Sequence, residues 1–166
     1  YNGMLDRYTY KLVGKQELYI PYNSFALRDK TRFNDKTLFG ADHLNPDARR
    51  YELHRVWIVQ ATVKSGVRHI YKRKILYVDE DTWLSLWSEA YDSHDQLWRT
   101  SFIDYHYSAE CECTHRGVSV YHDLTARAYE ATYLVNEAGP GNWWKLNDPA
   151  NIPDLYSPKA LANAGH

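Results

Sequence analysis

The sequence predicts a mainly β (α+β) protein, built on a curved antiparallel sheet with long loops and a short C-terminal helix. Segments rich in β-branched and aromatic residues, with period-two alternation, recur from Tyr8 to Val135. Turn residues separate these segments at the spacing of a meander. Several segments carry apolar residues on both faces, as Trp57 does beside Val56 and Ile58. A sheet with two apolar faces is covered on both sides or curved around something.

About eight strands fit this pattern. Gly14 is expected to turn the chain between the first two, and Pro21, which lacks a backbone donor, favours an edge position for the second. The expected strands are Tyr8–Val13, Glu17–Tyr22, Tyr51–Val63, Val67–Val78, Trp83–Tyr91, Gln96–Tyr107, Val118–His122 and Arg127–Val135.

The clearest expected hairpin joins the third and fourth strands through Lys64, Ser65 and Gly66, since Gly66 can take the positive φ of a three-residue loop. Val63 would then face Val67, and Trp57 would form a cation–π contact with Arg73. On one face the expected pairs are Val59 with Tyr71, Trp57 with Arg73, and Leu53 with Tyr77.

No linker divides the chain, and residues 1–166 are interpreted as a single domain. Residues 23–50 are polar and weakly periodic, which predicts a long surface excursion. Residues 136–166 form an irregular C-terminal tail in this interpretation. Within it, Ser157 and Pro158 are typical of a helix start, so Lys159–Ala164 is expected to be helical.

Charge and hydropathy exclude several partners. The chain has 20 Lys and Arg against 21 Asp and Glu, with a formal net charge of -1, so no overall field attracts nucleic acid. We therefore expect no nucleic-acid partner. No apolar stretch reaches the roughly 20 residues of a membrane-spanning helix, and no transmembrane segment is expected. The chain opens on Tyr1 without a signal peptide, which suggests a piece of a longer precursor.

Catalytic and metal chemistry have little motif support. Glycine-rich phosphate loops, His-Glu-x-x-His helices and Gly-x-Ser-x-Gly elbows are missing from the sequence. Cys111, Cys113 and His115 are the candidate metal ligands, but their spacing is shorter than that of usual zinc pairs. Asp104 and His106 would share a strand face and are a candidate acid–base pair. We predict no enzyme, no metal and no other cofactor.

Aromatic residues are the most informative feature of the composition. The chain contains 15 Tyr, 6 Trp and 4 Phe although its mean hydropathy is -0.65. Rings with a polar group suit ligand grooves as well as cores, so the aromatic strand residues, Trp83 among them, are expected to line a groove for a hydrophobic ligand. The predicted ligand-binding residues are Leu53, Trp57, Val59, Tyr71, Tyr77, Trp87, Trp98, Tyr105 and Tyr133.

Five phrases carry a family resemblance: Arg7–Asn23, His43–Asp47, Arg50–Trp57, Tyr77–Trp83 and Tyr156–Leu161. Together they resemble the C-terminal part of a domain-of-unknown-function family of exported Gram-negative proteins with an outer-membrane lipoprotein-sorting-like designation. That family is similar to the lipoprotein-localisation carriers LolA and LolB, whose curved antiparallel sheet forms an incomplete barrel around a hydrophobic cavity. The resemblance implies that this chain is the C-terminal half of such a larger incomplete-barrel domain.

The resemblance also implies a function. It suggests a protein in the periplasm, or at the periplasmic face of the outer membrane, that binds or transports a lipid, an acyl chain or a similar hydrophobic molecule. A membrane exporter or an outer-membrane protein would be its partner. Two alternatives stay open: a metal- or thiol-dependent enzyme that uses Cys111, Cys113 and His115, and a structural interaction module that binds a protein by completing the sheet.

Overall fold

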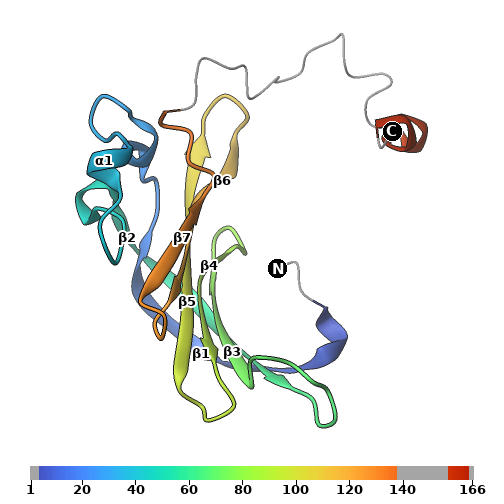
Figure 1. Ribbon diagram of the computed structural model, residues 1–166. Helices are drawn as coiled ribbons and strands as arrows, with labels where there is room; N and C mark the ends of the chain where they lie inside the picture. Colours follow the sequence, from blue (N-terminus) through green and yellow to red (C-terminus); the bar gives the residue numbers. More distant parts are fainter. Residues whose placement is uncertain (1–3, 138–156, 165–166) are drawn as a thin grey trace.

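The computed structural model describes residues 4–137 and 157–164. Within these ranges seven antiparallel strands form one sheet, and each strand pairs with its neighbours in sequence. Figure 1 shows the sheet curving strongly and remaining open, which confirms the predicted curved antiparallel architecture. The strands are β1 (Tyr8–Pro21), β2 (Tyr51–Val63), β3 (Arg73–Asp79), β4 (Ser85–Tyr91), β5 (Leu97–Ser108), β6 (Cys113–Asp123) and β7 (Ala128–Thr132).

The first predicted hairpin is wrong, because β1 runs straight through Gly14 as one strand. All of β1 pairs with β2, from Tyr8 opposite Val63 to Pro21 opposite Tyr51. A register shift between Leu12 and Gly14 absorbs one extra residue, as a β-bulge does. Glycine at this position therefore marks an irregularity within a strand and not its end. The predicted edge position of Pro21 is confirmed, since β1 is an edge strand.

The predicted register between β2 and β3 is also wrong. The connection is not a three-residue loop but residues 64–72, although Gly66 does take a positive φ of 78°. The predicted cation–π pair is replaced as well, because Lys15 lies over Trp57 at 4.2 Å and Arg73 over Tyr91 at 3.4 Å. The observed strand pairs include Trp57 with Val78, Ile58 with Tyr77, Val59 with Leu76, and Thr62 with Arg73.

The end of β1 packs against β5 and draws the sheet into its curve. Tyr22 forms a parallel bridge with Tyr105, and the Asn23 backbone N–H donates to the Tyr105 carbonyl at 2.8 Å. A hydrophobic cluster fills the space between these strands, so this part of the sheet is closed over by its own side chains. The buried members of the cluster are Ile20, Tyr22, Val56, Leu86 and Tyr105.

Residues 23–50 contain three short helical turns, η2 (Phe25–Arg28), α1 (Asp35–Leu38) and η3 (Pro46–Ala48). A capping box fixes the start of α1: the Thr37 N–H donates to the Asn34 side chain, and the Asn34 N–H donates to the Thr37 hydroxyl. Figure 1 shows these turns on one side of β6 and β7. They bury a second cluster against β6, made of Leu27, Phe33, Leu38, Leu44 and Ala48 with Val118 and Val120.

Two short helices flank the sheet in sequence. η1 (Leu5–Arg7) precedes β1, and the predicted C-terminal helix is confirmed as α3 (Pro158–Ala164). Most of the predicted irregular tail, residues 138–156 and 165–166, lies outside the described residues. Over the part of the chain that the structure describes, no helix has the length and apolar character needed to cross a bilayer.

Two glycines in strands give a matched test of backbone packing. A Cβ at Gly117 would lie 2.6 Å from the Asp104 carbonyl oxygen, whereas a Cβ at Gly14 would meet nothing within 4 Å. We expect Gly117→Ala to lower the free energy of unfolding by about 1–3 kcal/mol, because β5 and β6 must move apart. Gly14→Ala should change it by less than about 1 kcal/mol and in the stabilising direction. Urea denaturation measures both, and equal effects of the two variants would contradict the register of β5 and β6.

Candidate functional site

Strands β3 to β7 present an aromatic ladder on one face. Tyr77, Trp87 and Phe102 follow one another across β3, β4 and β5, with ring centroids 5.4 Å and 4.8 Å apart. His122 and Tyr129 continue the row at 6.0 Å and 5.7 Å. This face is the covered face, since the turns of residues 23–50 pack on it at β6 and the end of β1 packs on it at β4 and β5. Most of the large strand rings are therefore used in packing.

The opposite face, which we call the pocket face, carries smaller and more polar residues. Leu76 pairs with Ser88, Ser88 with Ser101, and Ser101 with Tyr121. A pocket of ≈770 Å³ lies over these residues. Its size falls within the range of roughly 300–1,000 Å³ that is usual for ligand sites. The apolar and aromatic part of the lining includes Leu76, Trp83, Leu84, Ala90, Ile103, Tyr105 and Tyr121.

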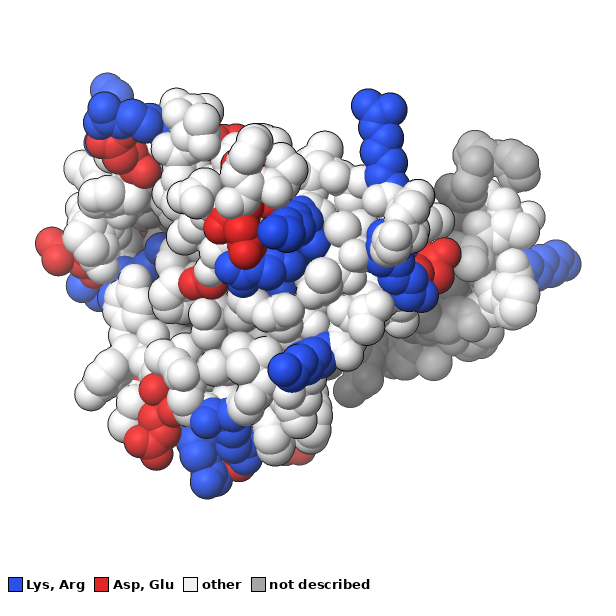
Figure 2. Space-filling model, turned by 90° about the horizontal axis from the view of Figure 1, so that it is seen from below, with Lys and Arg blue, Asp and Glu red and all other residues white. Residues whose placement is uncertain are grey.

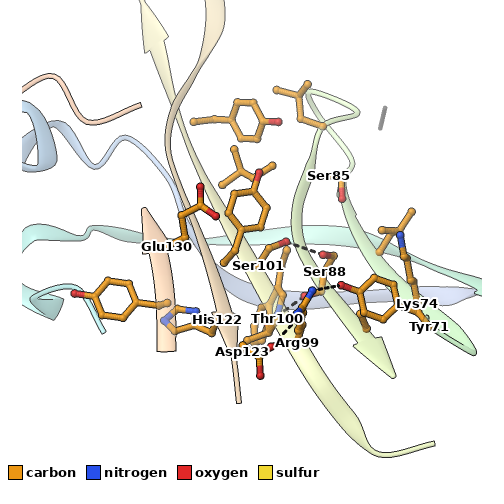
Figure 3. Close-up of a pocket in the computed structure, with 18 of the residues that line it drawn as sticks. Tyr71, Lys74, Ser85, Ser88, Arg99, Thr100, Ser101, His122, Asp123 and Glu130 are labelled. Carbon is orange, nitrogen blue, oxygen red and sulfur yellow. Dashed lines mark hydrogen bonds and ion pairs between the residues drawn. The ribbon is translucent and has the colours of Figure 1, made fainter. Parts of the chain in front are cut away.

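The polar groups on the pocket floor are bonded to one another. The hydroxyls of Ser88 and Ser101 lie 2.7 Å apart. Arg99 donates from Nε to Asp123 at 2.9 Å and from Nη1 to the Tyr71 hydroxyl at 3.0 Å. Figure 3 shows the two serines between β4 and β5, with the Arg99 group beside them. These bonds lower the cost of covering the Ser88, Ser101 and Arg99 groups with an apolar ligand.

Lys74 places a positive charge at one side of the pocket. Its Nζ lies 5.1 Å from the ring centroid of Tyr71 and 5.4 Å from that of Tyr8. Burial lowers the pKa of Lys74, because the charged ammonium loses water. Figure 3 shows Lys74 and Tyr71 on one side of the pocket and Glu130 on the other. The pocket therefore has a basic side at Lys74, an acidic residue, Glu130, on the opposite side, and a mainly apolar lining between them.

Trp83 is a strained and exposed part of the lining. Its φ is 60°, a conformation that costs a bulky residue free energy, and 71% of its surface is exposed. The turn that holds it is fixed by Asp79, which accepts hydrogen bonds from the Thr82 N–H and hydroxyl and from His54. The Trp83 ring stacks on Trp57 at 6.5 Å. A large ring is thus kept in solvent at the pocket rim at a cost in backbone energy.

The predicted ligand-binding residues fall into two groups. Tyr71, Trp87 and Tyr105 belong to the pocket lining, although the Trp87 indole donates to Thr100 and stacks in the ladder on the covered face. Trp57 and Val59 lie on the pocket face next to lining residues, since Trp57 stacks on Trp83 and Val59 pairs with Leu76. Ligand binding by any of these residues stays a prediction.

Four predicted residues lie elsewhere. Tyr77 is in the ladder, and burial with the nearby Glu89 raises the pKa of Tyr77 to about 12. Leu53 is exposed on β2, and Tyr133 follows β7 with Arg116 4.3 Å above its ring. Trp98 donates to Asp123 and packs edge-on against Tyr71. Trp98 therefore contacts the lining residue Tyr71 but does not itself line the pocket.

Sequence reasoning missed the small and polar lining residues. Ser88, Ala90 and Ser101 leave the space that makes the pocket, and Lys74 and Arg99 supply its positive charge. Alternation along β4 and β5 could have indicated Ser88, Ala90, Arg99 and Ser101, because each faces away from a large ring next to it in sequence. The sequence-based prediction selected the aromatic residues instead, because their side chains are the largest.

The predicted acid–base pair does not form a joint site. Asp104 is bonded to Arg49 at 3.3 Å, and His106 accepts from Arg28 at 2.8 Å. Burial raises the pKa of Asp104 and lowers the pKa of His106, in each case because the charged form loses water. Each group is thus paired with an arginine of the segment before β2.

Side chains that could hold a metal meet at two places among the described residues. One group is Cys111, Cys113 and His115, and the other is His54, Asp79 and Asp81. Asp79 already accepts from Thr82 and His54 and holds the turn before β4.

Figure 2 shows basic and acidic side chains interspersed on the face seen from below, without a patch of one sign.

Because of His122, we expect the free energy of unfolding to depend on pH. Burial, with Arg49 and His43 nearby, lowers the pKa of His122 from 6.5. Below that pH the unfolded chain binds the proton more readily than the folded one, so the free energy of unfolding should fall as the pH drops. His122→Phe keeps a ring in the ladder and should make this fall smaller. The exposed His94→Phe is the control, and equal pH slopes of the two variants between pH 7 and 5 would contradict the assignment.

Comparisons with known proteins identify the family. The family model described as "Protein of unknown function (DUF1329)" matches residues 1–162. The uncharacterized protein PA3922 of Pseudomonas aeruginosa is 40% identical over 166 residues, which are 99% of this chain and 35% of that protein. The chain thus spans about a third of the length of this relative.

Two solved structures show a partial likeness. A domain assigned as an outer membrane lipoprotein-sorting protein, from Vibrio parahaemolyticus, has 10% identity and a TM-score of 0.45, covering 76% of this chain and 39% of its own. A DUF1329 family protein from Desulfovibrio piger has 17% identity and a TM-score of 0.46, covering 82% of this chain and 44% of its own. The family match and the 40% identity confirm the resemblance to a domain-of-unknown-function family. This chain belongs to the DUF1329 family.

Proposed function

We propose that the pocket face binds a hydrophobic ligand with a negatively charged end, such as a fatty acid or another acyl lipid. The observation that carries this proposal is a pocket of ≈770 Å³ whose middle is lined by apolar and aromatic side chains. Burial of apolar ligand surface contributes roughly 25 cal/mol per Å², so a long acyl chain needs no specific chemistry to bind. The proposal keeps Tyr71 and Tyr105 among the predicted ligand-binding residues and puts the ligand on the face opposite the aromatic ladder.

The pocket also suggests how such a ligand would lie. The acyl chain would cover Ser88 and Ser101, whose hydroxyls are bonded to each other, and contact Tyr121 and Trp83. The negatively charged end would lie at Lys74, where burial makes a charged partner more valuable than in water. Trp83, held in solvent by its turn, would lose water when the ligand covers it.

Binding, and not catalysis, is the proposed activity. The serine hydroxyls of the pocket are bonded to each other, and Arg99 is paired with Asp123 and Tyr71. None of these contacts is the nucleophile–base pair of covalent catalysis. By the sequence resemblance to exported carriers, we place this binding in the periplasm, with a membrane exporter or outer-membrane protein as the partner that delivers or receives the ligand.

A pair of exposed tyrosines tests the pocket. Tyr121 lines it and is 40% exposed, whereas Tyr107 on β5 is 49% exposed and does not line it. We expect Tyr121→Ser to weaken binding of cis-parinaric acid, a fluorescent fatty acid, roughly tenfold, because about 50 Å² of apolar contact is worth about 1.3 kcal/mol. Tyr107→Ser should bind as the parent does. Absence of binding to the parent, or equal loss in both variants, would contradict the proposal, and mass spectrometry of copurified lipid gives a second readout.

Lys74 tests the charged end. We expect Lys74→Gln to weaken cis-parinaric acid by roughly tenfold, the value of one charge-assisted contact of about 1.4 kcal/mol. The uncharged methyl ester of the same probe should bind parent and variant alike. A loss of affinity that is the same for acid and ester would show that Lys74 acts through the shape of the pocket and not through its charge.

A further inference from the structure

The tip of the β5–β6 hairpin brings both cysteines of the chain to one histidine. Cys113 is the first residue of β6, and His115 follows it on the same face of the strand, because side chains two apart point the same way. Glu112 has a φ of 51°, which turns the chain back so that Cys111 meets the other two. None of these residues lines the pocket, so the group is independent of the proposed function. In Figure 1 this tip lies at the top of the molecule.

The three side chains converge on one point. The Cys111 sulfur lies 2.8 Å from His115 Nε2 and 2.7 Å from the Cys113 sulfur, and the Cys113 sulfur lies 3.4 Å from the same nitrogen. With metal–sulfur bonds of about 2.3 Å, two sulfurs on a tetrahedral ion lie about 3.8 Å apart. Side-chain rotations that separate the sulfurs by about 1 Å would therefore admit an ion, and the backbone can stay where it is.

The short contacts between the two sulfurs and the imidazole nitrogen crowd three potential ligand atoms together, and one cation placed between them would bind all three. Both cysteines are free thiols, and the exposed Cys113 leaves the site open to solvent.

We propose that Cys111, Cys113 and His115 bind one thiophilic d10 metal ion, Zn²⁺ or Cu⁺. Thiolate and imidazole are the ligands that both ions prefer. The group among the described residues holds three ligands, which suffices for Cu⁺ and leaves Zn²⁺ one position for water or an external ligand. His106 is the neighbouring imidazole, but its Nε2 accepts from Arg28 at 2.8 Å. This proposal replaces the sequence-based expectation that the chain binds no metal.

The competing chemistry is a disulfide between Cys111 and Cys113. Two thiols exchanging with an external disulfide would form one protein disulfide and release two thiols, and the protein would lose two hydrogens in mass. Such a bond would consume both sulfur ligands. The experiment below is therefore designed so that a disulfide and a metal give opposite results.

The full-length protein, purified with a non-thiol reductant, would be analysed for metal by mass spectrometry and titrated anaerobically with Co²⁺, Zn²⁺ and Cu⁺. We expect one ion per chain and a sulfur-to-cobalt charge-transfer band that Zn²⁺ displaces. Displacement by Zn²⁺ and competition with a Cu⁺ chelator rank the two ions. Circular dichroism of each variant confirms that it is folded.

Variants define the ligands. Cys111→Ser, Cys113→Ser and His115→Gln should each lose stoichiometric binding. Glu110→Gln in the same turn and His94→Gln in the β4–β5 turn, neither of which belongs to the group, should keep it. Failure to bind any of the three ions overturns the proposal, as do binding that survives both cysteine substitutions and a disulfide that forms in the presence of excess Zn²⁺.

Discussion

The alternation of side chains across β3–β7 is the constraint on which the rest of the structure depends. It places Tyr77, Trp87 and Phe102 on one face and Ser88 and Ser101 on the other. The face with the rings is covered by the end of β1 and by residues 23–50, both from the first part of the chain. The face with the serines is left with space over it. A shift of one residue in β4 or β5 would exchange the two faces of that strand and put large rings where Ser88 or Ser101 now lies.

The pocket persists because its small residues do not fill it and several of its polar groups bond to one another. The Ser88 and Ser101 hydroxyls bond to each other, and Arg99 is held by Asp123 and Tyr71. A buried polar group without a partner would cost about 1–3 kcal/mol and favour collapse or water. With these groups paired, less desolvation free energy is lost when a ligand covers the floor. The strained turn at Trp83 adds a ring at the rim that packing alone would have drawn inside.

Periodicity in the sequence predicted the positions of the strands better than the turns and the pairing registers that connect them. It placed the strands that became β4 to β7, and the Ser157–Pro158 signal placed α3, because these patterns are local. Gly14 was misjudged because a glycine in a strand pattern fits a bulge as well as a turn, and only the pairing partner decides between them. The predicted register of β3 was wrong for a related reason. Residues 64–72 form a loop outside the sheet, and His69 in this loop is hydrogen-bonded to the Tyr8 hydroxyl of β1. Such a contact cannot be read from the alternation within β2 and β3.

The candidate site was harder to predict than the fold, because small side chains that leave space contribute to a pocket as much as the large side chains that line it. Large rings drew attention in the sequence, yet most of them meet one another across the strands. The metal candidate shows the opposite case, since its three ligands lie within five residues and needed only the turn at Glu112 to converge. An ion there would close a loop so short that it removes little entropy from the unfolded chain. Ion binding at the hairpin tip and lipid binding in the pocket therefore do not depend on each other, and either can fail while the other stands.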